Sequence, residues 1–332
     1  MSKISLVSED KTLGSSSLTF KISGDDINYI IMNTIRRTIF SEIPIYAFAE
    51  FKFEKNTSIF HNNYLKARMS NPPVWGIDND IDFIKVEHIE EKAQSKEEAE
   101  PDSNDEIVMD TNEKAFIPSS LKQLTMYVNY KNKTSSIVDV TTDHANFYYD
   151  EKKIDSPYKH PFQIVKLQPE QEIVMTGMTK LGNEQQNVFY SAVSCVYYKQ
   201  IDDNTFDFSV ESRGQISERR ILHVALLHID KRLKHFYELF EKDFVPNEDD
   251  PSTGTIIMND EDNTMGNLIS RGLQLHKDIS YADYKLEHPL VRKVFWDYKL
   301  KSTKTPIKKI VKEVVDNYID LFEDIKKKLS KI

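Results

Sequence analysis

The chain contains little of what several classes of protein depend on. Cys195 is the single cysteine among 332 residues, which excludes an internal disulfide and any zinc site built from several cysteines. Glycine occurs at 9 positions that do not cluster, so no glycine-rich phosphate-binding loop is expected. No apolar run approaches the roughly 18–20 residues of a membrane-spanning helix, and residues 1–14 lack the apolar core of a secretory signal. These absences indicate a reducing, intracellular setting without a membrane segment.

Positive charge is also scarce. The chain has 44 Lys and Arg against 53 Asp and Glu, a formal net charge of −9. A free-standing nucleic-acid-binding domain is usually basic, so this balance favours protein partners over direct, sequence-specific nucleic-acid binding. Between Glu87 and Glu113 acidic residues dominate and large apolar residues are almost missing. This segment is predicted to be a disordered acidic loop, with a nucleic-acid mimic or a regulatory tail as the alternative.

Apolar periodicity near the start predicts a strand, a helix and a second strand. Alternation over Leu18–Ile22 indicates the first strand, and Ser23 or Asp25 can cap the helix that follows. Pro44 ends this helix, and a strand over Ile45–Phe53 comes next. A short helix is predicted over His61–Met69. The apolar stripe of the first helix consists of Ile27, Ile30, Ile31, Ile35 and Ile39.

The second part of the chain repeats this kind of pattern and carries two long amphipathic helices. One is predicted over Ser217–Glu241, and the other begins with Pro306 in its first turn. A shorter helix over Met265–His276 is expected to be capped by Asn263 or Thr264. Strands are predicted over Leu124–Tyr130, Phe206–Glu211, Thr255–Met258, Tyr281–Leu286 and Val291–Leu300.

The two ends of the chain correspond to each other as two copies of one half-unit. Each has a strand, an acidic turn, a helix with an asparagine (Asn33 or Asn267), further strands and one long helix. We align Asp25-Asp26-Ile27 loosely with Glu261-Asp262-Asn263. Two such halves are expected to pack as a pseudo-two-fold pair. The predicted interface consists of Ile221, Ala225, Ile229, Leu233, Phe236 and Phe240 on one long helix and Ile310, Val314, Leu321 and Ile325 on the other.

The predicted fold is therefore α+β, with two half-units forming an intramolecular pseudo-dimer and a mainly-β domain inserted into the first. The larger half is expected to comprise residues 1–52 and 206–242, and the inserted domain residues 53–205. A linker over residues 243–252, with two prolines and several acids, would precede the smaller half at residues 253–332. Periodicity by itself also allows two unrelated α+β segments.

Six strings of residues carry more specific information than periodicity. They are Asn33–Pro44 (NTIRRTIFSEIP), Leu65–Met69 (LKARM), Lys166–Ile173 (KLQPEQEI), Phe208–Gly214 (FSVESRG), Asp262–Leu268 (DNTMGNL) and Tyr284–Leu290 (YKLEHPL). In this order they resemble motifs of the alpha family of multisubunit RNA polymerases, which includes bacterial alpha, the archaeal D and L chains, and the third and eleventh subunits of eukaryotic polymerase II. Any one string is weak, but together they span nearly the whole chain.

The resemblance implies that the larger and the smaller alpha-like chains are fused here, as in large cytoplasmic DNA viruses. It also implies an intracellular location, in the cytoplasm of an infected cell, with packaging in the virion or a nuclear location left open. Several cellular members carry cysteine clusters in the inserted domain that bind zinc or an iron–sulfur cluster. Since this chain has Cys195 alone, no metal or other cofactor is expected in it.

By the same resemblance the chain is a non-catalytic platform on which the two large catalytic subunits and small subunits of a DNA-directed RNA polymerase assemble. The polymerase uses two metal ions held by carboxylates of its largest subunit, so no catalytic residue is expected here. Arg36 and Arg37 are about 100° apart on their helix, so at least one must project outward, where a guanidinium suits carboxylates and carbonyls of the second-largest subunit. Asn33 could cap a helix or bind a neighbouring strand, and Arg68 could extend the basic contact.

Two functions of other classes remain open at this point. One is a virion structural protein without polymerase contact. The other is a carboxylate-based hydrolase that uses residues such as Asp139, Asp143 and Asp150, although nothing in the sequence spaces these carboxylates as a site. Stoichiometric association with two very large chains would distinguish the polymerase platform from both.

Overall fold

The computed structural model describes residues 2–11, 16–75, 123–150, 152–247, 250–288 and 291–331. These residues form two compact units. One, here called the paired unit, consists of Met1–Ile45 and Asn183–Ile332; the other, the inserted unit, is Tyr46–Gly182. The insertion therefore begins before residue 53 and ends before residue 205, contrary to the predicted boundaries. The predicted acidic loop over Glu87–Glu113 lies outside the described residues.

The first half of the paired unit is a four-stranded antiparallel sheet with two helices. The strands run in the order β1-β2-β11-β10, and Phe20 opposite Phe208 stacks at a ring distance of 5.4 Å in its centre. The elements are β1 (Lys3–Lys11), β2 (Ser16–Ser23), α1 (Tyr29–Ser41), η3 (Val188–Tyr190), β10 (Val193–Asp202), β11 (Thr205–Ser212) and α4 (Glu218–Asp243). The predicted boundaries place the residues of β10 in the inserted domain. Because β10 pairs with β11, it belongs to this half instead.

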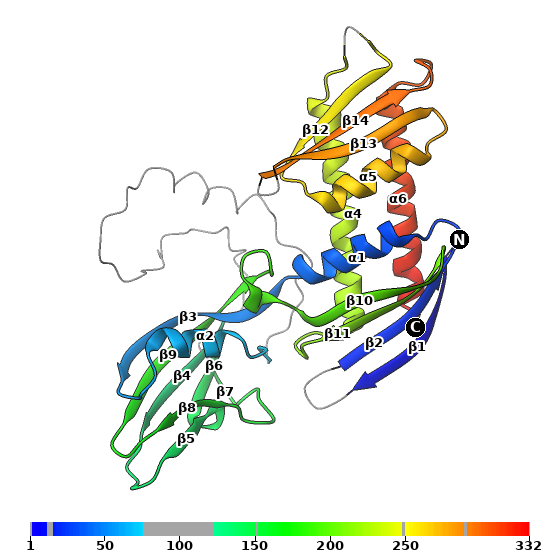
Figure 1. Ribbon diagram of the computed structural model, residues 1–332. Helices are drawn as coiled ribbons and strands as arrows, with labels where there is room; N and C mark the ends of the chain where they lie inside the picture. Colours follow the sequence, from blue (N-terminus) through cyan, green and yellow to red (C-terminus); the bar gives the residue numbers. More distant parts are fainter. Residues whose placement is uncertain are drawn as a thin grey trace, which may run out of the picture. The chain divides into compact units, whose positions relative to one another are not determined.

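The second half repeats this arrangement with one strand fewer. Its sheet has the order β12-β14-β13, which corresponds to β2-β11-β10 of the first half. The elements are β12 (Thr253–Asn259), α5 (Asn263–Leu275), β13 (Ile279–His288), β14 (Val291–Leu300) and α6 (Ile307–Leu329). Figure 1 shows both halves with a short and a long helix each, so the repeat inferred from periodicity is confirmed.

The predicted helix starts need three corrections. The side chain of Asn28, and not of Ser23 or Asp25, caps α1 by accepting from the backbone N–H groups of Ile30 and Ile31. Asp262, and not Asn263 or Thr264, caps α5. Pro306 precedes the first turn of α6 instead of occupying it. In the first two cases several adjacent Asn, Asp and Ser residues are chemically suitable, and only the path of the backbone selects one.

The inserted unit is mainly β and has its own core. A five-stranded sheet has the order β3-β9-β4-β6-β7, and β5 pairs separately with β8. Phe48 on β3 is fully buried in this core, while Phe51 and Phe53 of the same strand are partly buried and pack against it. The elements are β3 (Ile45–Asn56), α2 (Asn62–Ser70), β4 (Leu124–Lys131), β5 (Val138–Thr141), η2 (Thr142–His144), β6 (Ala145–Tyr149), β7 (Lys152–Ile154), β8 (Gln163–Leu167) and β9 (Glu172–Gly182).

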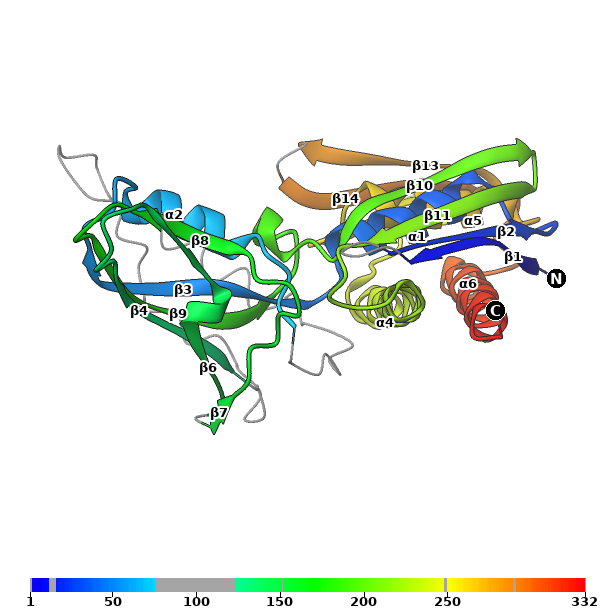
Figure 2. The ribbon, with the colours of Figure 1, turned by 90° about the horizontal axis from the view of Figure 1, so that it is seen from below.

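The two long helices of the paired unit form an apolar seam between its halves. Cα atoms of α4 lie within 8 Å of Cα atoms of α6. The two helices run side by side, and Figure 2 shows them end-on. Nearly all predicted interface residues on them are buried, whereas Leu321 is half-buried. The predicted pseudo-dimer packing is therefore confirmed. Among the described residues no helix is long and apolar enough to cross a membrane.

Candidate assembly interface

Helix α1 has two faces of different character. Its inward face is apolar and buried, with Ile31, Ile35 and Ile39 at helical spacing. The opposite face carries Tyr29, Asn33, Arg36 and Phe40, spaced four, three and four residues apart and therefore on one line along the helix. We call these four residues the outer stripe of α1. Tyr29 is 55% and Phe40 45% exposed, so aromatic surface flanks a polar pair.

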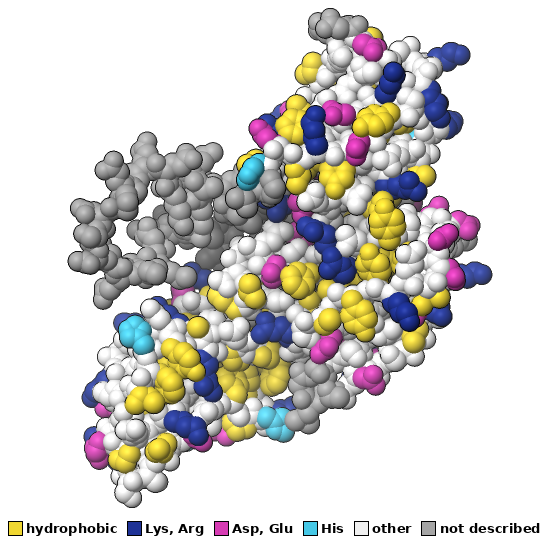
Figure 3. Space-filling view, viewed as in Figure 1, with side chains coloured by type: hydrophobic (Ala, Val, Ile, Leu, Met, Phe, Trp, Pro, Cys, Tyr) yellow, Lys and Arg dark blue, Asp and Glu magenta, His cyan; other side chains and the backbone are white. Residues whose placement is uncertain are grey.

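Two hydrogen bonds join the side chains of the polar pair in the middle of the outer stripe. Arg36 donates from Nε at 3.1 Å and from Nη2 at 2.8 Å to Oδ1 of Asn33, one turn earlier. This bond restricts the guanidinium to the helix surface, where it is half-exposed. Asn33 therefore positions an arginine. It lies inside α1, whose cap is Asn28, so the prediction that it caps this helix is wrong; its contact with a neighbouring strand stays a prediction. Figure 3 shows Lys and Arg among hydrophobic side chains over the region of α1.

Arg37 points to the other half of the paired unit instead of to solvent alone. Its Nε donates to Thr264 Oγ1 at 2.8 Å, and Nη2 lies 3.5 Å from Asp262 Oδ2 at the start of α5. The predicted role of Arg37 in binding a partner subunit is therefore not supported by its geometry. Its guanidinium bonds within the chain, although the side chain stays 43% exposed.

Behind Arg37 lies a group of buried charges, here called the charge cluster: Arg232, Glu42, Glu261 and Asp262. Arg232 on α4 donates from Nη2 to Glu261 Oε2 at 2.6 Å and to Asp262 Oδ1 at 2.9 Å. Its Nη1 lies 3.5 Å from Glu42 Oε1. The Arg232 side chain is 12% exposed. One arginine of the first half thus binds a carboxylate of its own half and two of the second.

Three further side chains surround the charge cluster. His228 Nε2 lies 3.3 Å from Glu42 Oε2, and both side chains are almost fully buried. Gln185 donates to the other oxygen of Glu42 and accepts from Nη1 of Arg292 at 3.3 Å. Arg292 also donates to the backbone carbonyl of Asp260. The cluster is therefore part of a continuous network across the boundary between the halves, in which Arg292 and Arg37 add positive charge near the three carboxylates.

The environment shifts the pKa values of these groups in different directions. Burial by itself would raise the pKa of the Asp262 carboxyl, but the charge of Arg232 and the backbone N–H of Thr264 outweigh it and lower the pKa well below its usual range. The pKa of Glu42 is also lowered, since His228 and Arg232 overcome its burial. The pKa of Glu261 is raised because its burial outweighs Arg232. Arg232 stays charged, because the three carboxylates raise its pKa despite burial.

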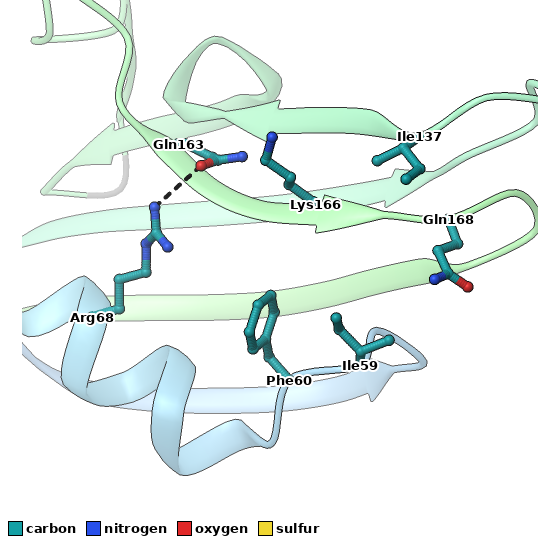
Figure 4. Close-up of a pocket in the computed structure, with 7 residues that line it drawn as sticks. All are labelled: Ile59, Phe60, Arg68, Ile137, Gln163, Lys166 and Gln168. Carbon is teal, nitrogen blue, oxygen red and sulfur yellow. Dashed lines mark hydrogen bonds between the residues drawn. The ribbon is translucent and has the colours of Figure 1, made fainter.

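Arg68 lies in the inserted unit, on α2. Its Nη2 donates to Gln163 Oε1 at 3.4 Å, across a groove between the α2 segment and β8 (Figure 4). The groove has a volume of about 190 Å³ and contains the exposed apolar side chains of Ile59 and Ile137. Arg68 therefore lies at this groove in the inserted unit, whereas α1 belongs to the paired unit. The expectation that Arg68 extends the basic contact of α1 stays a prediction. The groove is lined by Ile59, Phe60, Arg68, Ile137, Gln163, Lys166 and Gln168.

Two of the three carboxylates considered for hydrolysis bind other groups of the chain. Asp139 Oδ1 lies 3.3 Å from Lys166 and accepts from Gln163 at 2.7 Å, and Asp150 accepts from the backbone of Gln123. Asp143 lies in η2. Within the described part of the chain, no group of three or more His, Cys, Asp or Glu side chains is placed to hold a metal ion.

Sequence reasoning missed the charge cluster and both ends of the outer stripe. One signal was present for each. Arg232 stands three residues after Ile229 on the buried side of α4, where an apolar residue is expected. Tyr29 and Phe40 continue the spacing of Asn33 and Arg36 on the face opposite the isoleucines. Neither signal shows which residues lie across from these side chains in the folded protein, so neither identifies what they contact.

The fold and these contacts define a class: a dimerisation fold whose two halves lie in one chain. Comparison with known families agrees. Residues 19–233, more than half of the chain, match the RNA polymerase Rpb3/Rpb11 dimerisation domain, and residues 253–328 match a second domain of that description. The chain belongs to the RNA polymerase Rpb3/Rpb11 dimerisation domain family and contains two domains of that description, as expected of an assembly-type polymerase subunit.

One relative resembles the chain over most of its length. It is a protein of Acanthamoeba polyphaga mimivirus that is provisionally named as a DNA directed RNA polymerase subunit. The two are 22% identical over 324 residues, which cover 93% of this chain and 89% of the relative. The match covers nearly all of this chain, so it extends over both halves of the paired unit.

Proposed function

We propose that this chain is the non-catalytic platform of a DNA-directed RNA polymerase, which holds the two large catalytic subunits in register. The family membership, the joining of both dimerisation halves and the exposed surface on α1 support this role. The second-largest subunit is the proposed partner of α1, with the largest subunit and small subunits as further partners. The platform requires no cofactor of its own, and it acts inside the infected cell.

The observation that carries the proposal is the outer stripe of α1. Aromatic residues and arginine contribute most to binding at protein interfaces, because they bury large area while ordering few rotatable bonds. Here Tyr29 and Phe40 leave about half of their surface exposed on both sides of Arg36. Arg36 is ordered in advance by its two bonds to Asn33, so little side-chain entropy is lost when its remaining donors meet partner carboxylates or carbonyls.

The experiment is co-expression of the tagged chain with the two large polymerase subunits, followed by pull-down of stoichiometric complex. Arg36→Ala is expected to lower the affinity by at least roughly 30-fold, since loss of a buried charge-assisted contact costs about 2–5 kcal/mol. Arg36→Lys should restore little, because a lysine cannot form the same fork. Lys327→Ala, at the exposed end of α6, is the matched control.

Testing the two arginines separately makes the outcome interpretable. Arg37→Ala should reduce the stability of the isolated chain more than its binding, since Arg37 bonds Thr264 and Asp262 within the chain. Circular dichroism on each variant verifies folding. Unchanged recovery of the large subunits with a folded Arg36→Ala chain would contradict the contact. Absence of any stoichiometric complex with the unmodified chain would favour a virion structural role instead.

A further inference from the structure

The two halves of the paired unit can be aligned residue by residue from their helix caps. Helices α1 and α5 have 13 residues each and begin after the caps Asn28 and Asp262. This registration places Asn33 opposite Asn267 in the alignment, as predicted. It moves the acidic turn by two residues, however, so that Ile27 and not Asp25 corresponds to Glu261.

The long helices follow the same rule. The N-caps of α4 and α6 are Ser217 and Pro306, and aligning them superimposes the two apolar stripes. Five of the six resulting pairs are buried on both sides, and the sixth has a half-buried tyrosine. The pairs are Ile221 with Ile310, Ala225 with Val314, Ile229 with Tyr318, Leu233 with Phe322, Phe236 with Ile325, and Phe240 with Leu329.

The charge cluster does not obey this pseudo-symmetry. Arg232 of α4 corresponds to Leu321 of α6 in the alignment. The carboxylates that Arg232 binds in the second half, Glu261 and Asp262, correspond to Ile27 and Asn28 in the first. The buried cation is therefore present in one half, and two of its three carboxylate partners are present in the other.

We infer that the charge cluster is a pairing-specificity device, which admits the two unlike halves to each other and rejects a like half from a second copy of this chain. In a pair of first halves, Arg232 would face Ile27 and Asn28 across the boundary and would keep only Glu42 of its own half as a carboxylate partner. A pair of second halves would bury Glu261 and Asp262 against Leu321. Buried charges that lose opposite partners are strongly unfavourable, and specificity commonly rests on such a penalty against the wrong partner.

The apolar seam cannot provide this discrimination. Its stripes are apolar in both halves at corresponding positions, and apolar burial is not directional. The four-residue cluster therefore decides between partners that the seam alone would accept. This inference concerns the isolated chain and does not depend on the proposed role in a polymerase.

The test uses the full-length chain and replaces the three residues that face one another across the boundary by their counterparts in the other half. The symmetrised variant carries Arg232→Leu, Glu261→Ile and Asp262→Asn, so the helix cap is preserved. Unmodified and variant chains are unfolded in urea and refolded over a wide range of protein concentrations. Size-exclusion chromatography with light scattering then measures the oligomeric fraction.

The unmodified chain is expected to refold to monomer throughout, whereas the oligomeric fraction of the symmetrised variant should rise several-fold with concentration. The control removes the exposed pair Lys285 and Asp297 by alanine substitution, and it should behave like the unmodified chain. A symmetrised variant that unfolds cooperatively yet refolds to monomer at every concentration would overturn the inference.

A conservative variant keeps the test decisive if the symmetrised chain does not fold. Glu261→Gln with Asp262→Asn removes both negative charges while retaining the side-chain shape and one acceptor oxygen on each side chain. Arg232 then meets neutral groups in either pairing, so oligomers of like halves should again appear on refolding at high concentration. If this variant too refolds to monomer alone, the cluster does not determine pairing.

Discussion

The two halves of the paired unit meet in two ways that differ in physical character. Along α4 and α6 they bury apolar side chains such as Leu233 and Phe322, while at the start of α5 they share the charge cluster. Apolar burial stabilises in proportion to area, at about 25 cal/mol per Å². Buried charges stabilise little in net terms, because desolvation offsets their attraction. The seam therefore supplies most of the stability, and the cluster supplies the geometry of pairing.

The largest effect is expected when the central cation of the charge cluster, Arg232, is removed alone. Arg232→Met keeps much of the volume but leaves Glu261, Asp262 and Glu42 buried without their shared partner. We expect a loss of about 3–5 kcal/mol in the free energy of unfolding, measured by urea denaturation. Lys234→Met, which breaks an exposed pair on the same helix, is the control and should cost less than about 1 kcal/mol. Equal small losses would show that the cluster is solvated.

A crowding mutation tests the contribution of close packing between α5 and α6. A Cβ on Gly272 would lie 2.3 Å from Val314 Cγ1 and 2.8 Å from a ring atom of Tyr318. Gly272→Ala should therefore destabilise the chain by about 1–3 kcal/mol, although alanine favours helix in general. Thermal unfolding by circular dichroism measures this effect. A rise in Tm would mean that the two helices move apart at no cost.

Acidification should have the smallest effect and distinguishes the members of the cluster. Asp262 and Glu42 have lowered pKa values, so the stability that they contribute is present above the ordinary carboxyl pKa of about 4 and is lost as pH falls below it. Glu261 has a raised pKa and opposes folding as pH rises through that value. Urea unfolding between pH 3 and 7 should therefore show a shallower acid loss for Asp262→Asn.

The same pH series can be used to compare Glu261→Gln with Asp262→Asn. Glu261→Gln removes the group whose contribution has the opposite sign, so this variant should lose stability at least as steeply as the unmodified chain below about pH 4. Identical profiles for both variants would contradict the assigned directions of the two pKa shifts.

The order and type of the elements in the paired unit followed from the sequence, because the stripes of α4 and α6 and the alternation in β2 and β11 are long and regular. The domain boundary did not follow. The alternating segment before β11 is equally suited to the inserted sheet and to the paired one, and only its pairing with β11 places β10 in the latter. Strand alternation indicates a half-buried strand but not its neighbour.

For the candidate site, too, some features could be predicted from the sequence and others only from the structure. The sequence was sufficient to single out Asn33, Arg36 and Arg37 on one helix, since their spacing is set by helix geometry. It could not separate the two arginines, whose side chains leave the helix about 100° apart. The structure directs Arg36 to Asn33 and the surface and Arg37 to Asp262 and Thr264.

By itself the sequence determined the class of protein, the two-fold repeat of half-units and the apolar surfaces that join them, because these depend on local periodicity and on strings of adjacent residues. The tertiary structure alone decided which charges face one another. Arg232 and Glu261 are 29 residues apart along the chain, and Glu42 lies far from both. A contact between distant residues depends on the relative placement of packed helices, which local pattern does not encode.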